Sequence, residues 1–133
     1  MAVLIDSNVL IRFEKQETPI HEKIKGREKE SLFIFVITTS ELLHGVYRAT
    51  SQRIKTKRLA FVEAVLEHYP MLELDLATAR THAQLWSTLT SQGKMIGLHD
   101  SWIVATCLTH GLILVTYNTK EFQRIPGLQV EQW

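Results

Sequence analysis

The residues of this sequence most able to do chemistry are three acids that stand where apolar runs give way to helical patterns. Asp6 follows the apolar run 2–5, Glu41 follows a second apolar run, and Asp100 lies at the start of a later helical pattern. In open α/β sheets, ligands bind beyond the carboxyl ends of the strands. These placements favour catalytic carboxylates, although each acid taken alone also fits a helix-capping role.

Three carboxylates in one pocket would repel one another strongly. Two unit charges about 5 Å apart, at an effective dielectric near 20, repel by roughly 3 kcal/mol, so a cluster requires a compensating cation. Mg²⁺ or Mn²⁺ suits such an oxygen donor set, whereas a site without Cys or His ligands argues against zinc. A hard divalent ion activates water for attack on phosphorus, so the acids predict phosphodiester hydrolysis.

Hydrophobic patterning predicts the elements that position these acids. Apolar runs too short for helices predict strands at 2–5, 32–37, 71–74, 112–115 and about 128–130. Helical spacing occupies the segments between them: from Ser7, from Ser40, and over 51–69, 76–91 and 97–111. A short helix is also expected to begin at Pro19. This alternation predicts one α/β domain over 1–133, a central parallel β-sheet flanked by helices on both faces.

Cap residues refine the expected helix starts. Ser7 or Asn8 can cap the first helix, and Ser40 can cap the next with Glu41 in its first turn. In the helix over 76–91, Trp86 shares one face with two alanines, and packing of that face on the sheet or on a partner subunit is expected.

Composition excludes several classes of protein. The 133 residues carry a net charge of +1, so the overall charge does not indicate a nucleic-acid partner. The single cysteine, Cys107, excludes an intrachain disulfide and fits a cytoplasmic location. No apolar stretch reaches the roughly 18 residues of a membrane span, and no export signal is recognisable at the N-terminus.

Four blocks of the sequence resemble PIN-domain proteins, specifically the VapC-type toxins of bacterial toxin-antitoxin pairs. The blocks are LIDSNVLI, TTSELLHG, IGLHDSWIVATCLTHGLILVTYNTKEF and IPGLQVEQW, and the similarity runs nearly end to end. The resemblance implies a PIN fold, metal-dependent endoribonuclease activity, and a homodimer. It also implies inhibition by a cognate VapB-type antitoxin whose C-terminal segment occupies the active-site groove, with operator DNA contacted only through that antitoxin.

The same resemblance assigns roles to individual residues. Asp6, Glu41 and Asp100 match the family's acids and should coordinate Mg²⁺ or Mn²⁺, directly or through water. Asn118 stands where many members carry a fourth, aspartate, residue, which predicts one strong metal site and a weaker second one. Three hydroxyl residues either orient the carboxylates or simply cap helices: Ser7, Ser40 and Thr116.

Other polar residues carry weaker signals. None of the six histidines shows close metal-ligand spacing, so they are expected to be solvated or partly packed, although His44 and His99 lie near acids in the sequence. A basic run either tracks an RNA backbone or forms a solvated face: Arg53, Lys55, Lys57 and Arg58. The resemblance further makes four residues candidates for subunit or antitoxin contacts: Leu42, Leu43, Tyr47 and Leu59.

The expected function is that of an endoribonuclease toxin cutting structured RNA, with tRNA or rRNA the family-implied substrates. Attack by water rather than by the ribose 2′-hydroxyl would leave a 5′-phosphate and a 3′-hydroxyl. One alternative is a catalytically degenerate PIN protein, disabled by Asn118, that acts mainly as a binding partner in an antitoxin–operator complex. A phosphoacceptor domain of the receiver type fits poorly, because Asp6 stands alone where such domains carry a pair of acids.

Overall fold

A five-stranded sheet in which every pair of neighbours is parallel forms the centre of the molecule. The computed structural model describes residues 2–15, 22, 26 and 30–133, so the helix expected at Pro19 lies outside the described residues. The strands are β1 (Ala2–Ile5), β2 (Ser31–Phe35), β3 (Met71–Leu72), β4 (Ile113–Val115) and β5 (Val130–Glu131). Their order across the sheet is β3-β2-β1-β4-β5. The predicted central parallel sheet is confirmed.

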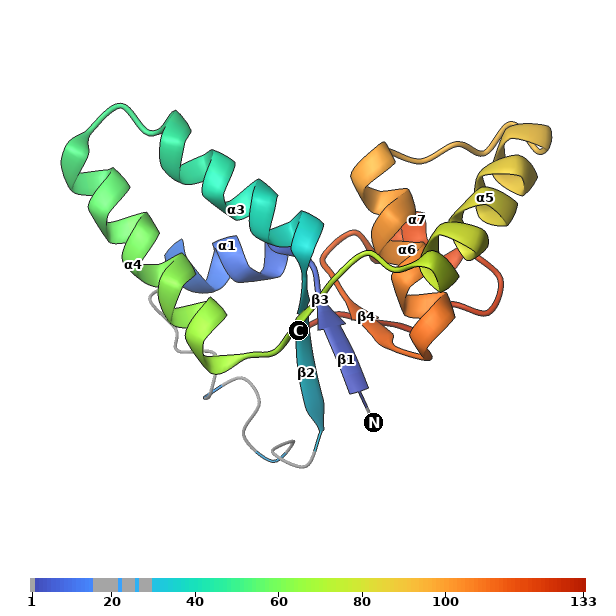
Figure 1. The fold of residues 1–133 in the computed structure, drawn as a ribbon, viewed down its shortest axis with the longest axis horizontal. Coiled ribbons are helices and arrows are strands. Elements are labelled where there is room, and N and C mark those ends of the chain that lie inside the picture. The colour runs from blue at the N-terminus through green and yellow to red at the C-terminus, as the bar shows by residue number, and fades with distance from the viewer. Residues whose placement is uncertain (1, 16–21, 23–25, 27–29) are drawn as a thin grey trace.

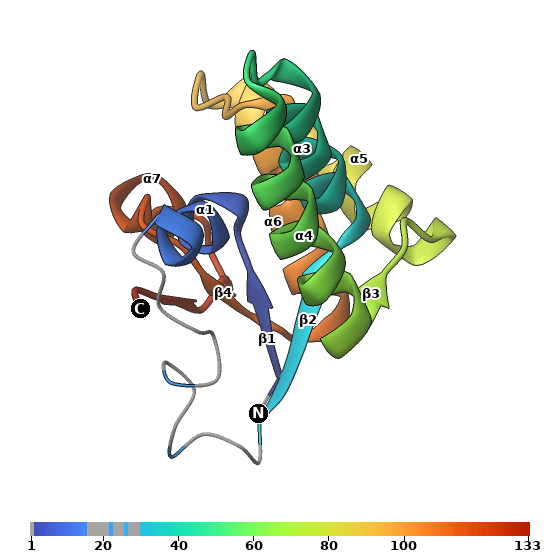
Figure 2. The same cartoon turned by 90° about the vertical axis from the view of Figure 1, so that its left-hand side faces the viewer.

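Helices cover both faces of this sheet (Figures 1 and 2). They are α1 (Ser7–Lys15), α3 (Val36–Arg48), α4 (Gln52–His68), α5 (Leu76–Ser91), α6 (Leu98–His110) and α7 (Thr119–Gln123). Because side chains alternate along a strand, Val3 and Ile5 of β1 pack with α1, α3 and α4, while Leu4 packs with α5, α6 and α7. The sheet thus separates two apolar cores.

The order of the strands reverses direction between β1 and β4. From β1 the chain builds outward through β2 to β3, and then returns to place β4 on the other side of β1. Such a reversal is a topological switch point, where flanking helices leave the sheet in opposite directions. Asp6 and Thr116 follow β1 and β4 there, and the Asp6 N–H donates to the Val115 carbonyl at 2.9 Å.

Helix α3 begins four residues earlier than the sequence predicts. Val36 and Ile37 were expected to extend the second strand, but pairing of β2 ends at Phe35, opposite Leu72. Beyond that pair no strand hydrogen bonds hold the chain extended, and helical packing overrides the β-propensity of these branched residues. The prediction that Ser40 caps this helix is wrong: Ser40 lies inside α3 and Glu41 falls in its second turn.

Three smaller expectations also differ from the structure. Helix α5 buries Thr78, His82 and Leu89, so the face carrying Trp86 does not pack on the sheet, and Trp86 is 52% exposed. Packing of that face on a partner subunit stays a prediction. Helix α7 was not predicted, because five residues are too few to display helical periodicity. Strand β5 begins at Val130, two residues later than expected.

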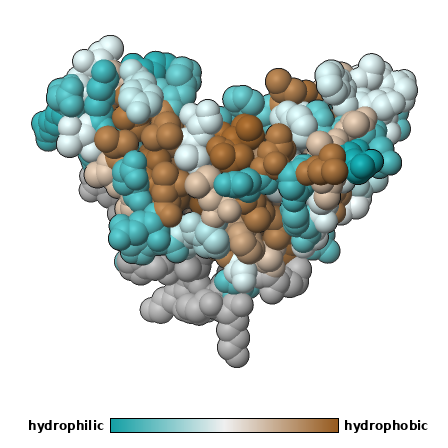
Figure 3. Space-filling model, in the orientation of Figure 1, coloured by the Kyte–Doolittle hydropathy of each residue, from teal (hydrophilic) through white to brown (hydrophobic). Residues whose placement is uncertain are grey.

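Of the four candidates for subunit or antitoxin contacts, two pack in the core and two are exposed. Leu42 is buried in the core, and Leu43 packs against it. Tyr47 (72% exposed) and Leu59 (39% exposed) line a hollow of about 520 Å³ on the α3–α4 hairpin. Figure 3 shows apolar side chains gathered over this hairpin. No helix of the described residues is long and apolar enough to span a bilayer.

The central strand β4 provides a test of the core. Leu114 is fully buried, whereas Leu76 at the start of α5 is 68% exposed. Leu114→Ala should lower the free energy of unfolding by about 3–5 kcal/mol, because it removes buried contacts and leaves a cavity. Leu76→Ala is the matched control and should change it by less than about 0.5 kcal/mol. Urea titrations at one protein concentration would measure both, and equal losses would contradict the assigned core.

Candidate active site

Asp6 is a buried carboxylate held by hydrogen bonds on both oxygens. It is 6% exposed. Its Oδ1 accepts from the Ser7 N–H and its Oδ2 accepts from the Thr116 hydroxyl, each at 2.8 Å. The Asp6 carbonyl also accepts from the Val9 N–H, so Asp6 itself occupies the cap position expected for Ser7 or Asn8. Burial raises the pKa of Asp6, and the bonds from Thr116 and Ser7 oppose that rise.

Thr116 connects the end of β4 to the start of α1. Its side chain is fully buried, and its hydroxyl oxygen accepts from the Asn118 N–H at 3.1 Å and from Asn8 Nδ2 at 3.3 Å. Asn8 Oδ1 in turn accepts from the Tyr117 N–H. This network leaves the Asp6 carboxylate little freedom to rotate, and it places Thr116, among the predicted hydroxyl residues, in direct contact with an acid.

Glu41 approaches Asp6 from the second turn of α3. Burial raises the pKa of Glu41, nearby His99 lowers it, and the negative charge of Asp6 raises it further. Glu41 Oε2 lies 3.6 Å from His99 Nδ1, on the first turn of α6. Ser7 also forms a hydrogen bond with Glu41 that lowers this pKa. Two acids separated by 35 positions in the sequence are therefore electrostatically coupled in the fold.

Asp100, in the first turn of α6, completes the predicted set of acids. Burial, followed by the charges of Asp6, Glu121 and Glu41, raises the pKa of Asp100 to about 6, while His99 lowers it. The fold therefore brings the three predicted acids to the same edge of the sheet. The charges of Asp6 and Glu41 lie near enough to Asp100 to add to the effect of burial on its pKa.

The contribution of Glu121 was missed by the sequence analysis. Glu121 lies in the first turn of α7, the helix that patterning does not reveal. Asn118, expected at the fourth position, is the exposed residue just before this helix; its N–H bonds to Thr116 and its side chain makes no cap hydrogen bond. The available signal was an acid six residues after the strand expected at 112–115, and its meaning depended on knowing that a short helix begins there.

The donor chemistry of these acids fits a hard divalent cation. All are carboxylates, their mutual repulsion would be relieved by positive charge, and the hydrogen-bonded oxygens of Asp6 retain a second lone pair each. Within the described residues, no three His, Cys, Asp or Glu side chains already converge closely enough to hold an ion. Asp6, Glu41 and Asp100 would therefore form an open site, completed by water or substrate oxygens.

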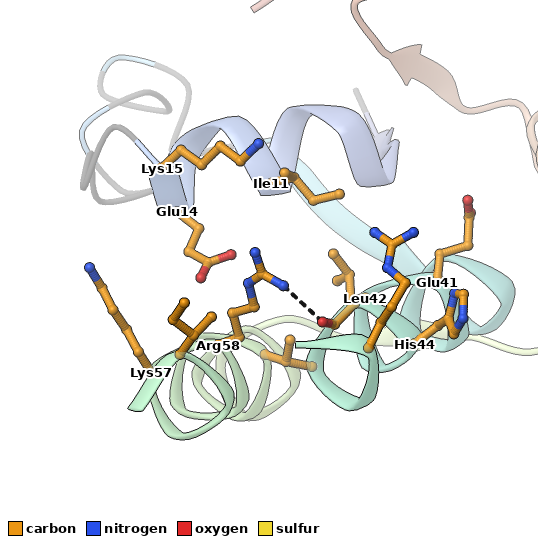
Figure 4. A pocket seen from close by; sticks show the side chains of 12 residues that line it. Ile11, Glu14, Lys15, Glu41, Leu42, His44, Lys57 and Arg58 are labelled. Atoms are coloured by element: carbon orange, nitrogen blue, oxygen red, sulfur yellow. Dashed lines mark hydrogen bonds between the residues drawn. The ribbon is translucent and has the colours of Figure 1, made fainter. Parts of the chain in front are cut away.

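A pocket of about 370 Å³ lies beside this site, between α1, α3 and α4 (Figure 4). Glu41 lies at one end of it, and Arg58 ties α4 to α3 by donating to the Gly45 carbonyl at 2.9 Å. Its basic lining residues are Lys15, His44, Arg48, Lys57 and Arg58. The basic residues of α4 therefore do not all face one pocket. Lys57 and Arg58 line the pocket beside Glu41, whereas Lys55 lines the separate hollow that contains Tyr47.

Comparison with known proteins identifies the family. The family model for the PIN domain matches residues 3–128. The chain is 34% identical over 130 residues to Ribonuclease VapC1 of Rickettsia felis, covering 98% of this chain and 95% of the relative. It is 29% identical over 130 residues to the tRNA(fMet)-specific endonuclease VapC of Shigella flexneri, covering 98% and 96%.

A solved structure agrees with these relatives. The chain matches DNA-bound VapBC from Salmonella typhimurium with a TM-score of 0.89 and 28% identity, over 100% of this chain and 98% of that one. Fold and sequence similarity thus agree over nearly the whole length. The chain belongs to the PIN domain family and, within it, to the VapC group.

Proposed function

We propose that this chain is the toxin of a toxin-antitoxin pair, a Mg²⁺- or Mn²⁺-dependent endoribonuclease that hydrolyses phosphodiester bonds of structured RNA. The observation that carries the proposal is the set of mutually repelling carboxylates at the β1–β4 switch point. The names of the relatives, Ribonuclease VapC1 and tRNA(fMet)-specific endonuclease VapC, support the reaction and favour tRNA as the substrate class.

In this proposal the protein's part is to hold charge in fixed positions. Asp6, Glu41 and Asp100 hold the cation, and Glu121 adds a fourth negative charge beside Asp100. When bound, the cation supplies Lewis-acid activation of water and neutralises charge on the phosphate. Thr116 and the Ser7 N–H keep both oxygens of Asp6 oriented. Attack by water, with the 2′-hydroxyl uninvolved, leaves a 5′-phosphate and a 3′-hydroxyl.

The pocket beside Glu41 is the proposed docking place for a segment of a VapB-type antitoxin. Its walls combine apolar residues such as Ile11 and Leu42 with cations such as Arg48, so it suits a peptide with apolar and acidic side chains. A chain lying there reaches Glu41 at its end and obstructs RNA. The Salmonella VapBC structure, an assembly bound to DNA, supports such a partner.

The direct test is cleavage of a tRNA pool by the purified protein with Mg²⁺, Mn²⁺ or EDTA. Asp6→Asn and Asp100→Asn should each lower the cleavage rate by at least about 100-fold, because each removes a metal-binding charge. EDTA should abolish cleavage by the parent protein. Circular dichroism would verify that both variants fold, and parental cleavage by either folded variant would refute the site.

Stability without metal should reveal the cost of ionising Asp100, which comes first from burial and then from the charges of the neighbouring acids. The folded-state pKa of Asp100 is raised from 3.8 to about 6, so the folded protein binds this proton more tightly than the unfolded chain does. The associated stability is full below pH 3.8 and is lost as the pH rises through about 6.

We therefore expect Asp100→Asn in EDTA to melt at a higher temperature than the parent near pH 8, and to show no such gain near pH 3.8. Thermal unfolding followed by circular dichroism at both pH values would measure this difference. A variant that gains nothing near pH 8 would show that the folded protein does not disfavour the ionised Asp100 carboxylate.

Substitutions at Glu121 and Asn118 distinguish the contributions of these two residues to cleavage. Glu121→Gln should lower cleavage about tenfold or more, because it removes one of the negative charges proposed to attract the cation beside Asp100. Asn118→Asp should change cleavage by less than about threefold, since Asn118 is exposed and a new charge there is screened. Initial rates at saturating Mn²⁺ would compare them. A large gain in Asn118→Asp would instead favour the degenerate binding protein as the parent's function.

A further inference from the structure

We propose that His82 of α5 is a positioning residue for Asp100, acting through Ser101 to fix the first turn of α6. The inference rests on the proposed function for its catalytic consequence, but the contact itself can be tested separately. His82 lies outside the acid cluster, and no role was assigned to it by sequence.

His82 reaches α6 through a directed chain of hydrogen bonds. Its ring is buried, at 3% exposure, and its Nε2 lies 2.9 Å from Ser101 Oγ. The Ser101 hydroxyl donates to the Leu98 carbonyl at 2.7 Å, so its only proton is already used. Ser101 must therefore accept from His82, which assigns the proton of the neutral ring to Nε2.

Aromatic packing holds the same ring in place. His82 stacks on Trp102 with ring centroids 3.6 Å apart and planes 9° from parallel. Trp86 meets it edge-on, with centroids 5.8 Å apart. His82 therefore contacts the two residues that directly follow Asp100, one through a hydrogen bond and the other through its ring face.

The first turn of α6 depends on such support because its own cap is weak. The cap residue is Gly97, which has no side chain to accept from the first N–H groups. A Cβ at Gly97 would stand 3.7 Å from Asp100 Oδ2, so the Asp100 carboxylate lies back over this turn. Its position thus follows the backbone of residues 97–101, and the bond from His82 to Ser101 anchors that backbone to α5.

A second bond between α5 and α6 provides a matched control. The hydroxyl oxygens of Thr81 and Thr109 lie 2.8 Å apart in a hydrogen bond, about two turns further along α6. It joins the same two helices beside His82 on α5 but far from Asp100 on α6. A role in helix packing alone would make the two bonds equivalent, whereas positioning of Asp100 requires only the one from His82.

The test compares His82→Phe, His82→Gln and Thr81→Val in steady-state cleavage of tRNA. Phe keeps an aromatic ring against Trp102 and leaves the Ser101 proton bonded to Leu98, so the protein should fold. We expect His82→Phe to lower kcat about tenfold with KM within twofold, as loss of a supporting group around a metal site does. Gln retains an N–H donor and should restore kcat to within about threefold of the parent, and Thr81→Val should leave it unchanged.

Amide hydrogen exchange in the metal-free protein measures the contact without any activity. The Ser101 N–H, which donates to the Gly97 carbonyl, should exchange about tenfold faster in His82→Phe and at the parental rate in Thr81→Val. Unchanged exchange, a parental kcat in His82→Phe, or an equal loss in Thr81→Val would each overturn the proposal. If the parent cuts no RNA, the proposed function fails, while the exchange result still decides the role of His82.

Discussion

The hydrogen bond between Thr116 and Asp6 joins the two strands on which the site depends. It links the residues that follow β1 and β4, and it holds a carboxylate that is almost fully buried. A buried charge is costly unless it is bonded, and Asp6 is bonded through both oxygens. The parallel pairing of β1 with β4 makes this possible, because it brings residues 110 positions apart to one point.

Around that point the fold brings together charges of one sign. Glu41, Asp100 and Glu121 come from three different helices, and each is fixed by its own helix rather than by attraction to the others. Two separate apolar cores, one on each face of the sheet, supply the stability that offsets this repulsion. A stable scaffold that holds mutually repelling carboxylates is expected where binding of a cation completes the site.

The two faces of the sheet contribute differently to the site. The α1, α3 and α4 side supplies Glu41 and an open, basic pocket that suits a partner chain. The α5, α6 and α7 side supplies Asp100 and Glu121. On this side the stacking of His82 on Trp102 joins α5 to α6. One side thus offers a pocket that a partner chain could enter, and the other holds the helix that carries Asp100 in place.

The sequence alone determined that the chain has these strands, that the sheet is parallel, and that Asp6, Glu41 and Asp100 lie near strand ends or helix starts, because apolar runs are local patterns. The start of α3 and the existence of α7 were decided by tertiary structure: pairing with β3 ends β2 at Phe35, and a five-residue helix shows no periodicity. The sequence analysis also missed the roles of Glu121 and His82. Their roles arise from contacts across 19 or more positions, and only the folded chain brings such residues within hydrogen-bonding or electrostatic range.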